Sequence, residues 1–180
     1  MMNVRHTARY ALAAILALGI FGFAMAAEGK KEEGPEKKIA KKDLPAAVFS
    51  SFQKAYPAAK IVGTSQETED STTYFEIESR DGKVKRDILY KADGTVKEIE
   101  EGVAKASLPV AVKDAIAKEY PKGIIQKGEK TTRDNVVSYE VILKNGKDRM
   151  EVVVDETGKV LKTEKMTRQE EKEEKAEGKK

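Results

Sequence analysis

Two stretches, LPAAVFSSFQKAYP at residues 44–57 and LPVAVKDAIAKEYP at residues 108–121, decide the architecture of this chain. In both, apolar side chains recur every three or four residues and form one stripe, which is typical of a helix packed on a core. Asp43 and Ser107 are predicted to cap the helices, and the prolines that end the two stretches are predicted to stop them. The stripe residues are Leu44, Ala47, Val48, Ser51, Phe52 and Tyr56 in the first stretch, and Leu108, Ala111, Val112, Ala115, Ile116 and Tyr120 in the second.

These stretches belong to an internal repeat with an offset of 64 residues. Residues 44–100 and 108–164 are identical at 16 of 57 positions without a gap. Because the agreement extends well beyond the helices, duplication explains it better than coincidence. The chain is therefore predicted to contain two copies of one structural unit, repeat 1 at residues 43–101 and repeat 2 at residues 107–164.

The remainder of each copy has the pattern of antiparallel strands. Apolar and acidic side chains alternate from Phe75 to Glu78, with the period of two that a strand requires. Asp81-Gly82 and Asn145-Gly146 are the dipeptides of type I′ hairpin turns, and residues 91–94 and 155–158 form longer turns with a left-handed glycine. We predict an α+β fold of two tandem repeats, each with one helix packed on a four-stranded antiparallel sheet.

Both ends of the chain differ in composition from the repeats. Residues 1–26 combine Arg5 and Arg9 with an apolar run and an Ala-Met-Ala ending, which indicates a signal peptide cleaved after Ala26. An uncleaved N-terminal anchor is the alternative. Residues 27–42 are predicted to be a charged flexible linker and residues 165–180 a charged disordered tail. The mature protein is accordingly expected to be periplasmic or secreted, without stable membrane insertion.

The residues that the mature chain lacks exclude several functions. After removal of His6 with the signal peptide, it contains no His, Cys or Trp. The commonest general base and the strongest nucleophile are then both absent, so no catalytic residues and no enzymatic activity are expected. No phosphate-binding glycine loop is found, hence no cofactor is expected. Lys and Glu are interspersed and nearly balanced, which gives no compositional case for nucleic-acid binding.

Two groups of carboxylates leave a second class of function open. Glu67, Glu69 and Asp70 are close in sequence, as are Asp155 and Glu156. Neither group has the alternating oxygen ligands of a calcium loop, so hairpin turns are the preferred interpretation and no metal ligands are assigned. An envelope divalent-ion or stress sensor that uses these carboxylates nevertheless remains the alternative function.

The repeated motifs match a known family. The pattern Leu-Pro-x-Ala-Val, then Tyr-Pro, then strands joined by Asp-Gly or Asn-Gly and a later Gly-x-Val turn resembles PepSY-like proteins, which include β-lactamase-inhibitor-like periplasmic proteins. The resemblance covers residues 44–164 in two tandem copies. It implies a duplicated helix-on-sheet fold in an exported protein that inhibits or regulates another exported protein.

Strand alternation predicts where a partner would bind. If Phe75 and Ile77 face the helix, their neighbours must face the other side of the sheet. That outer face mixes apolar and charged side chains, as protein-binding surfaces do. An exported protein or peptide is therefore the expected partner, bound by Tyr74, Glu76, Leu89, Glu140, Ile142 and Val153. Phe49 and Tyr74 have a second interpretation, in which they pack where the two repeats meet.

Overall fold

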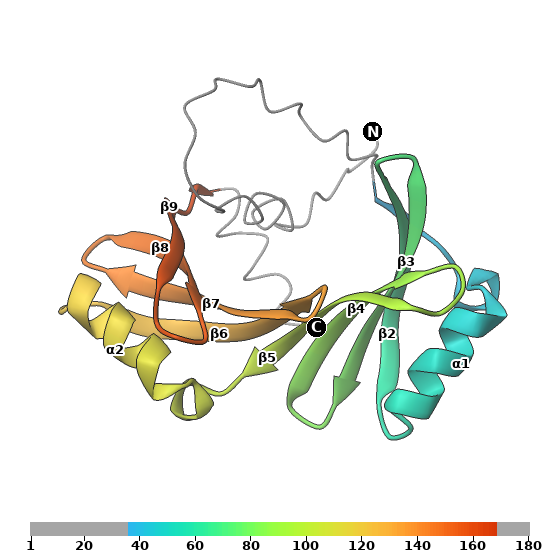
Figure 1. Cartoon of the computed structure of the whole chain (residues 1–180), viewed down its shortest axis with the longest axis horizontal. Coiled ribbons are helices and arrows are strands. Elements are labelled where there is room, and N and C mark those ends of the chain that lie inside the picture. Colours follow the sequence, from blue (N-terminus) through green and yellow to red (C-terminus); the bar gives the residue numbers. More distant parts are fainter. Residues whose placement is uncertain (1–35, 169–180) are drawn as a thin grey trace.

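A computed structural model of the chain describes residues 36–168. It is a mixed α/β structure in which one nine-stranded antiparallel sheet carries two helices. The sheet is curved, and both helices lie on its outer side (Figure 1). Neither helix has the length and apolar character needed to cross a bilayer within this part of the chain.

The strands follow one another across the sheet in chain order, from β1 to β9. The first half contains β1 (Lys37–Lys38), α1 (Ala46–Ala55), β2 (Lys60–Glu69), β3 (Thr72–Asp81), β4 (Val84–Lys91) and β5 (Val96–Val103). The second half contains α2 (Val110–Glu119), β6 (Ile124–Arg133), β7 (Val136–Asn145), β8 (Asp148–Asp155) and β9 (Val160–Lys165). The sequence predicted a separate sheet in each copy. Instead, β5 pairs with β6 from Glu98 to Val103 and joins the two halves into one sheet.

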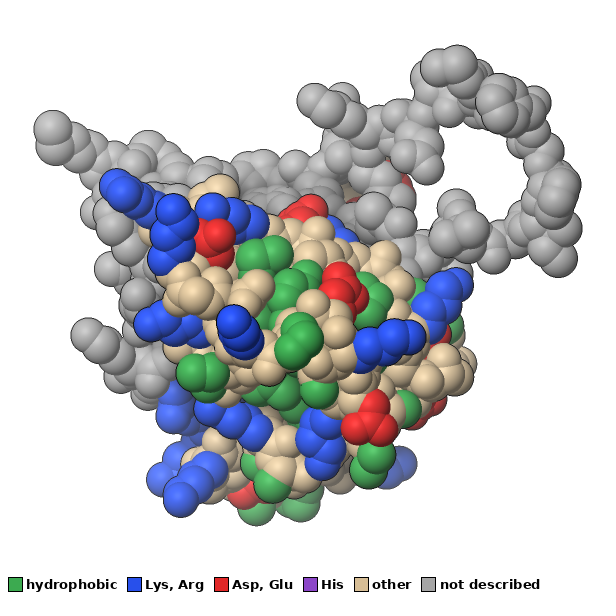
Figure 2. All heavy atoms as spheres, turned by 90° about the vertical axis from the view of Figure 1, so that its left-hand side faces the viewer, with side chains coloured by type: hydrophobic (Ala, Val, Ile, Leu, Met, Phe, Trp, Pro, Cys, Tyr) green, Lys and Arg blue, Asp and Glu red, His purple; other side chains and the backbone are tan. Residues whose placement is uncertain are grey.

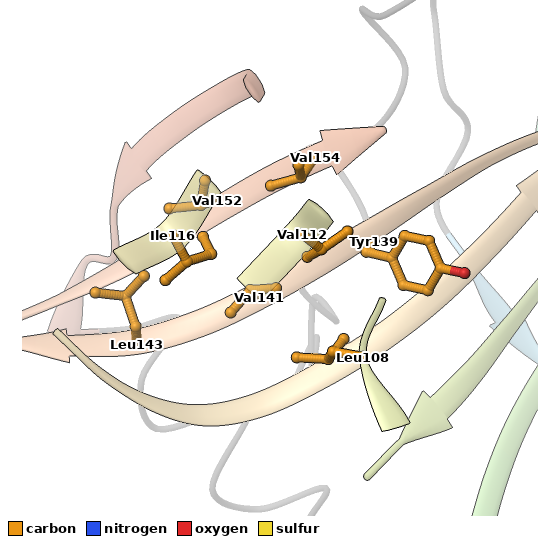
Figure 3. Packing of buried hydrophobic residues seen from close by; sticks show 8 residues of the cluster. All are labelled: Leu108, Val112, Ile116, Tyr139, Val141, Leu143, Val152 and Val154. Carbon is orange, nitrogen blue, oxygen red and sulfur yellow. The ribbon is translucent and has the colours of Figure 1, made fainter. Parts of the chain in front are cut away.

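Both helices bury the large aliphatic side chains and Phe52 of the predicted stripe, whereas Ala47, which was also assigned to the stripe, is exposed. In the first half, Leu44, Val48 and Phe52 form a cluster with sheet residues Ile77, Ile88 and Tyr90. In the second half, Leu108, Val112 and Ile116 pack against Tyr139, Val141, Leu143, Val152 and Val154 (Figure 3). Each large side chain removed from water contributes about 1.5–3 kcal/mol to folding before entropy is counted. The two clusters thus hold both helices on the same face of the sheet.

The helices begin differently from the prediction. Asp43 and Ser107 do not cap them; each ends a short 3₁₀ turn, Lys41–Asp43 or Lys105–Ser107. The residues that precede α1 and α2 are Pro45 and Pro109, and neither helix has a side-chain cap. The chain leaves each 3₁₀ turn through an extended leucine, which buries that leucine in the core and carries the predicted cap away from the helix.

The hairpin turns are also displaced from the predicted positions. Asp81 is still paired with Val84, so the loop is Gly82–Lys83 and only Gly82 has positive φ, at 58°. A positive φ at the first loop residue alone is the pattern of a type II′ turn. Two positive φ angles occur instead between β2 and β3 at Asp70 and Ser71, and between β6 and β7 at Asp134 and Asn135. Short polar residues tolerate this conformation without glycine.

Order extends past both predicted ends of the repeats. Ile39, inside the predicted linker, donates its backbone N–H to the Thr64 carbonyl (3.1 Å) and packs against the first core cluster. Met166, inside the predicted tail, is buried and bonds through its N–H to the Arg149 carbonyl (3.0 Å). Each of these charged segments thus combines one apolar contact with backbone hydrogen bonds to the sheet. The predicted signal peptide, residues 27–35 and residues 169–180 lie outside the described part.

Candidate functional site

The candidate site is the side of the sheet opposite the helices, here called the helix-free face. Strand register assigns its residues, because directly paired residues point to the same side. Glu76 lies opposite Leu89, and Glu140 lies opposite Val153. Tyr74 is two residues from Glu76 on β3, and Ile142 is two residues from Glu140 on β7, so both point to the same side as these pairs. All six residues expected to bind a partner therefore belong to this face.

Their burial differs from the expectation of an open surface. Tyr74, Glu76 and Ile142 are buried, and Val153 has no exposed area at all. Leu89 and Glu140 are half-buried. Long charged side chains occupy neighbouring positions, with Glu151 opposite Ile142 and Lys162 opposite Val153, and such stems cover apolar surface. The face is therefore less open than alternation alone predicted.

In the first half, the face contains a compact polar group around Tyr74. The Lys97 ammonium lies 3.8 Å from the centroid of the Tyr74 ring and forms an ion pair with Glu69. Beside it, the Ser65 hydroxyl donates a hydrogen bond of 2.7 Å to the Glu76 carboxylate. Tyr74 thus holds a lysine over its ring. Neither Tyr74 nor Phe49, which contacts Lys41, lies at the β5–β6 junction, so the interpretation that they pack between the repeats is wrong.

The equivalent carboxylate of the second half has a different environment. Glu140 occupies the position of Glu76, but Glu129 replaces the serine opposite it. Burial raises the pKa of Glu140 to about 8, and the charges of Glu151 and Glu129 act in the same direction against the smaller effects of Lys127 and Lys162. The Glu140 carboxyl is consequently protonated over much of the neutral range.

The pairing of β5 with β6 was missed by the sequence reasoning, although a strand was predicted at each position. On this face, Glu98 forms an ion pair with Arg133 across β5 and β6, and Glu100 lies opposite Thr131. Gly102, in the middle of the nine strands, lies opposite Glu129. These residues become neighbours only because the two sheets are joined. Gly102 follows directly after the predicted end of repeat 1 at residue 101, because β5 continues to Val103.

Charge is distributed unequally between the halves. Residues 44–103 contain eight Lys and Arg against eleven Asp and Glu, whereas residues 104–168 contain fourteen against ten. Figure 2 shows the α2 end of the molecule, where basic side chains are prominent among scattered apolar ones. The balanced charge of the whole chain therefore conceals an acidic half and a basic half.

The carboxylates considered for the ion-sensor hypothesis lie in turns or form ion pairs and hydrogen bonds within the fold. Glu69 pairs with Lys97, and Asp70 lies in the β2–β3 turn with φ of 48°. The Thr157 hydroxyl donates a hydrogen bond to Asp155 and lowers the pKa of its carboxyl, helped by the backbone N–H groups of Lys159 (3.0 Å) and Thr157 (2.9 Å). Within residues 36–168, no three acidic side chains are arranged to hold a metal ion. No observation on this part of the chain favours the sensor.

Comparison with known proteins identifies the family. The family described as "Putative beta-lactamase-inhibitor-like, PepSY-like" matches residues 22–82 and 73–162, which together span most of the chain. The chain belongs to this PepSY-like family. The two matches overlap at residues 73–82, so they do not follow the boundaries of the 64-residue repeat.

Solved structures from Bacteroides share the fold of this PepSY-like protein. A DUF2874 family protein of B. uniformis is 17% identical, with a TM-score of 0.56 over 67% of this chain and 88% of its own. A "putative periplasmic" protein of B. eggerthii is 18% identical (TM-score 0.57, 68% and 89%). A BLIP-like protein of B. fragilis is 18% identical (TM-score 0.54, 67% and 85%). No curated protein matches the chain.

Proposed function

We propose that this protein is an exported, non-enzymatic binding module whose helix-free face receives another envelope or secreted protein and thereby inhibits or regulates it. The observation that carries the proposal is the placement of both helices on one side of a continuous sheet. Opposite them, a face that spans both halves mixes aliphatic, aromatic and charged side chains. We further propose that one helix on its own four strands is the duplicated unit.

Membership of a β-lactamase-inhibitor-like family supports a binding role. The absence of His and Cys from residues 27–180 supports a role without catalysis. Export is supported by the signal-peptide pattern of residues 1–26, with cleavage after Ala26, and the destination is the periplasm or the cell exterior. No relative identifies the partner, so the proposal is limited to an exported protein or peptide.

Site-specific photo-crosslinking in cells tests the proposal. A photoreactive residue at Leu89, half-buried on the helix-free face, should capture a partner, whereas the same residue at Ala117, exposed on α2, should not. Equal capture at both positions, or capture only at Ala117, would contradict the use of this face.

Affinity for the captured partner provides the second measurement. Leu89→Ser should weaken binding about tenfold, equivalent to about 1.4 kcal/mol, because it removes apolar contact area from the interface. Leu89→Ile is the matched control and should retain affinity. Tyr74 is unsuitable for this purpose, since Tyr74→Ala also removes the ring beneath Lys97. Unchanged affinity in a folded Leu89→Ser variant would exclude this part of the face.

A further inference from the structure

A basic tip forms the outer end of the second half of the molecule. Lys144 of β7 pairs with Arg149 of β8 beside the hairpin turn, and on its other side it pairs with Ile124, the first residue of β6. The end of β9 lies next to β8, and the last turn of α2 leads into β6 at this end (Figure 1). The charged residues of the basic tip are Lys118, Lys122, Lys144, Lys147, Arg149 and Lys165, together with the acidic Glu119 and Asp148.

Most of these cations are not used by the fold. Lys165 lies 2.9 Å from Asp148, and Arg149 donates a hydrogen bond of 2.9 Å to Gln126. Four exposed lysines form no ion pair or hydrogen bond with any other described residue, namely Lys118, Lys122, Lys144 and Lys147. Attraction to the C-terminal end of α2 accounts for Lys118, but the other three lie outside the helix.

An exposed aliphatic side chain lies among these charges. Ile124 is 64% exposed, although the next residue, Ile125, packs against the core. Lys122 is two residues before Ile124, and Lys144 lies directly opposite it. Figure 2 shows this end of the molecule, with apolar side chains between the basic ones. Such a combination favours an anionic bilayer, whose phosphates attract lysines and whose interface accepts apolar side chains.

The equivalent end of the first half has the charge without the apolar group. Its hairpin contains three basic residues between positions 80 and 85, as the second hairpin does between positions 144 and 149. Lys83 occupies the position of Lys147, but Lys60 occupies the position of Ile124. The first hairpin is therefore a matched control within the same chain.

We propose that the basic tip rests on the surface of an anionic phospholipid bilayer. The unpaired lysines contact lipid phosphates, and Ile124 enters the headgroup region. The contact is peripheral, at the strand ends of the second half. An acidic protein fits less well, because protein interfaces are enriched in arginine and depleted in lysine, whereas this tip has five lysines and one arginine.

Cosedimentation with vesicles tests the proposal. The sample is the predicted mature chain, residues 27–180, because the apolar run before it would itself bind lipid. Phosphatidylcholine vesicles with about 30% phosphatidylglycerol should bind the protein, and pure phosphatidylcholine vesicles should not. Added salt at about 0.5 M should weaken the binding, since it screens the charges. Equal sedimentation with both kinds of vesicle, or with neither, would overturn the proposal.

A single tryptophan reports which end of the molecule meets the lipid, because the chain contains none. Ile124→Trp should give fluorescence that shifts to the blue with anionic vesicles, as the indole leaves water. Val136→Trp is the control, since Val136 is also exposed, at 53%, but begins β7 at its opposite end. A shift at both positions, or at Val136 alone, would contradict contact through the basic tip.

Paired charge removal separates the tip from general attraction to a lysine-rich chain. Lys144→Gln with Lys147→Gln should lower affinity for the anionic vesicles at least tenfold, because each lysine near such a surface contributes roughly fivefold. Arg80→Gln with Lys83→Gln removes the same charge from the first hairpin and should change affinity little. Equal losses from the two pairs of substitutions would refute the assignment to the basic tip.

Soluble polyglutamate distinguishes a lipid surface from an acidic protein. Binding of polyglutamate that Lys144→Gln with Lys147→Gln removes, without binding of anionic vesicles, would replace the lipid by an acidic protein and overturn the proposal. The photo-crosslinking at Leu89 is independent of these measurements. Capture of a partner there, without vesicle binding, would refute the lipid contact and leave the proposed function intact.

Discussion

The two halves of the molecule have kept the same core and acquired different faces. Beneath the helices, equivalent positions remain apolar and fully buried in both halves. On the helix-free face, several equivalent positions have changed charge or size. The core pairs are Val48 and Val112, Ile77 and Val141, and Ile88 and Val152, whereas the changed pairs are Ser65 and Glu129, Glu69 and Arg133, Glu78 and Ile142, and Glu98 and Lys162. Close packing restricts the first set, whereas the second set has exchanged one kind of local partner for another, as where Ser65 bonds Glu76 but Glu129 faces Glu140.

The cores differ mainly at the edge nearest the helix C-termini. In the first half, Arg86 lies 4.4 Å from the centroid of the Tyr56 ring and donates a hydrogen bond of 2.6 Å to Glu101. The equivalent of Arg86 in the second half is Met150, and the equivalent of the buried Tyr90 is Val154. Repeat 1 therefore has polar groups at these positions where repeat 2 has apolar ones. Burying those polar groups costs free energy that the second core does not lose.

Charge placed in either core should have the largest effect. Val48→Asp and Val112→Asp each bury an unpaired carboxylate at a position with no exposed area, at a cost of several kcal/mol. Because β5 and β6 join the halves, we expect either variant to unfold the whole sheet in one transition. Urea unfolding monitored by circular dichroism measures the result. If a variant has the same urea midpoint as the wild type, the stripe does not belong to the core. Two separate transitions would show that the halves unfold independently.

The two matched glutamates predict a pH effect confined to the second half. The pKa of Glu140 is raised to about 8 from its ordinary 4.5, so the folded state binds the proton more tightly than the unfolded chain. Stability should therefore fall as pH rises from about 4.5 to 8, by at most about 1.4 kcal/mol per pH unit. Unfolding at a series of pH values measures this slope, and Glu140→Gln should remove it.

Replacement by the residue of the other half sharpens this test. Glu129→Ser places opposite Glu140 the donor that Ser65 provides to Glu76, and it also removes one negative charge. The pKa of Glu140 should then move down towards its ordinary value, as carboxyl-carbon NMR would show. An unchanged titration would mean that Glu129 is not a cause of the shift.

A smaller effect is expected from the buried tyrosine of the first half. The Tyr90 hydroxyl has no hydrogen-bond partner within residues 36–168 although the residue is completely buried. Tyr90→Phe removes this unsatisfied group and should stabilise the protein by about 1 kcal/mol, measured as a higher melting temperature. Tyr120→Phe, at a half-buried position in the other half, is the control and should change little. A lower melting temperature for Tyr90→Phe would reveal a partner for the hydroxyl.

The smallest difference concerns the turns before the last strand of each half. Asp155 accepts hydrogen bonds from two residues, Thr157 and Lys159, whereas Asp93 is bonded by Thr95, through its N–H at 2.8 Å and its hydroxyl. These bonds lower the pKa of both carboxyls, so their contribution is present at neutral pH and is lost as pH falls through the lowered values. Asp155→Ala should lower the melting temperature more than Asp93→Ala. A larger loss for Asp93→Ala would contradict the stronger hydrogen bonding of Asp155.

Local periodicity explains how much of the fold was predictable from sequence. The stripes at residues 44–56 and 108–120 and the alternation around Phe75 are set by neighbours in the chain, and those residues fill the two cores. The type II′ loops were misplaced because the dipeptide Asp81-Gly82 does not specify which residue begins the loop. The conformation of the turn at Asp70 was not predicted, because its residues adopt positive φ without glycine.

The candidate site was predictable only in part, for a different reason. Register placed the six expected residues on one side of the sheet, but their burial depends on long side chains of neighbouring strands, such as Lys97, Glu151 and Lys162, which alternation within one strand does not describe. The pairing of Gly102 with Glu129 joins residues that no repeat contains together. A periodic pattern carries no information on such contacts, so the centre of the face appeared only in three dimensions.

In the strand order from β1 to β9, each strand pairs with the one that follows it in the chain. Contacts of this kind close short loops, which costs little entropy, and they allow folding to proceed stepwise. A chain that crosses a membrane N-terminus first can therefore form each new ladder as soon as the next strand emerges, without waiting for distant residues. Each new strand covers the edge of the strand before it, so on that side of the sheet an unpaired edge is exposed to other chains only until the next strand emerges.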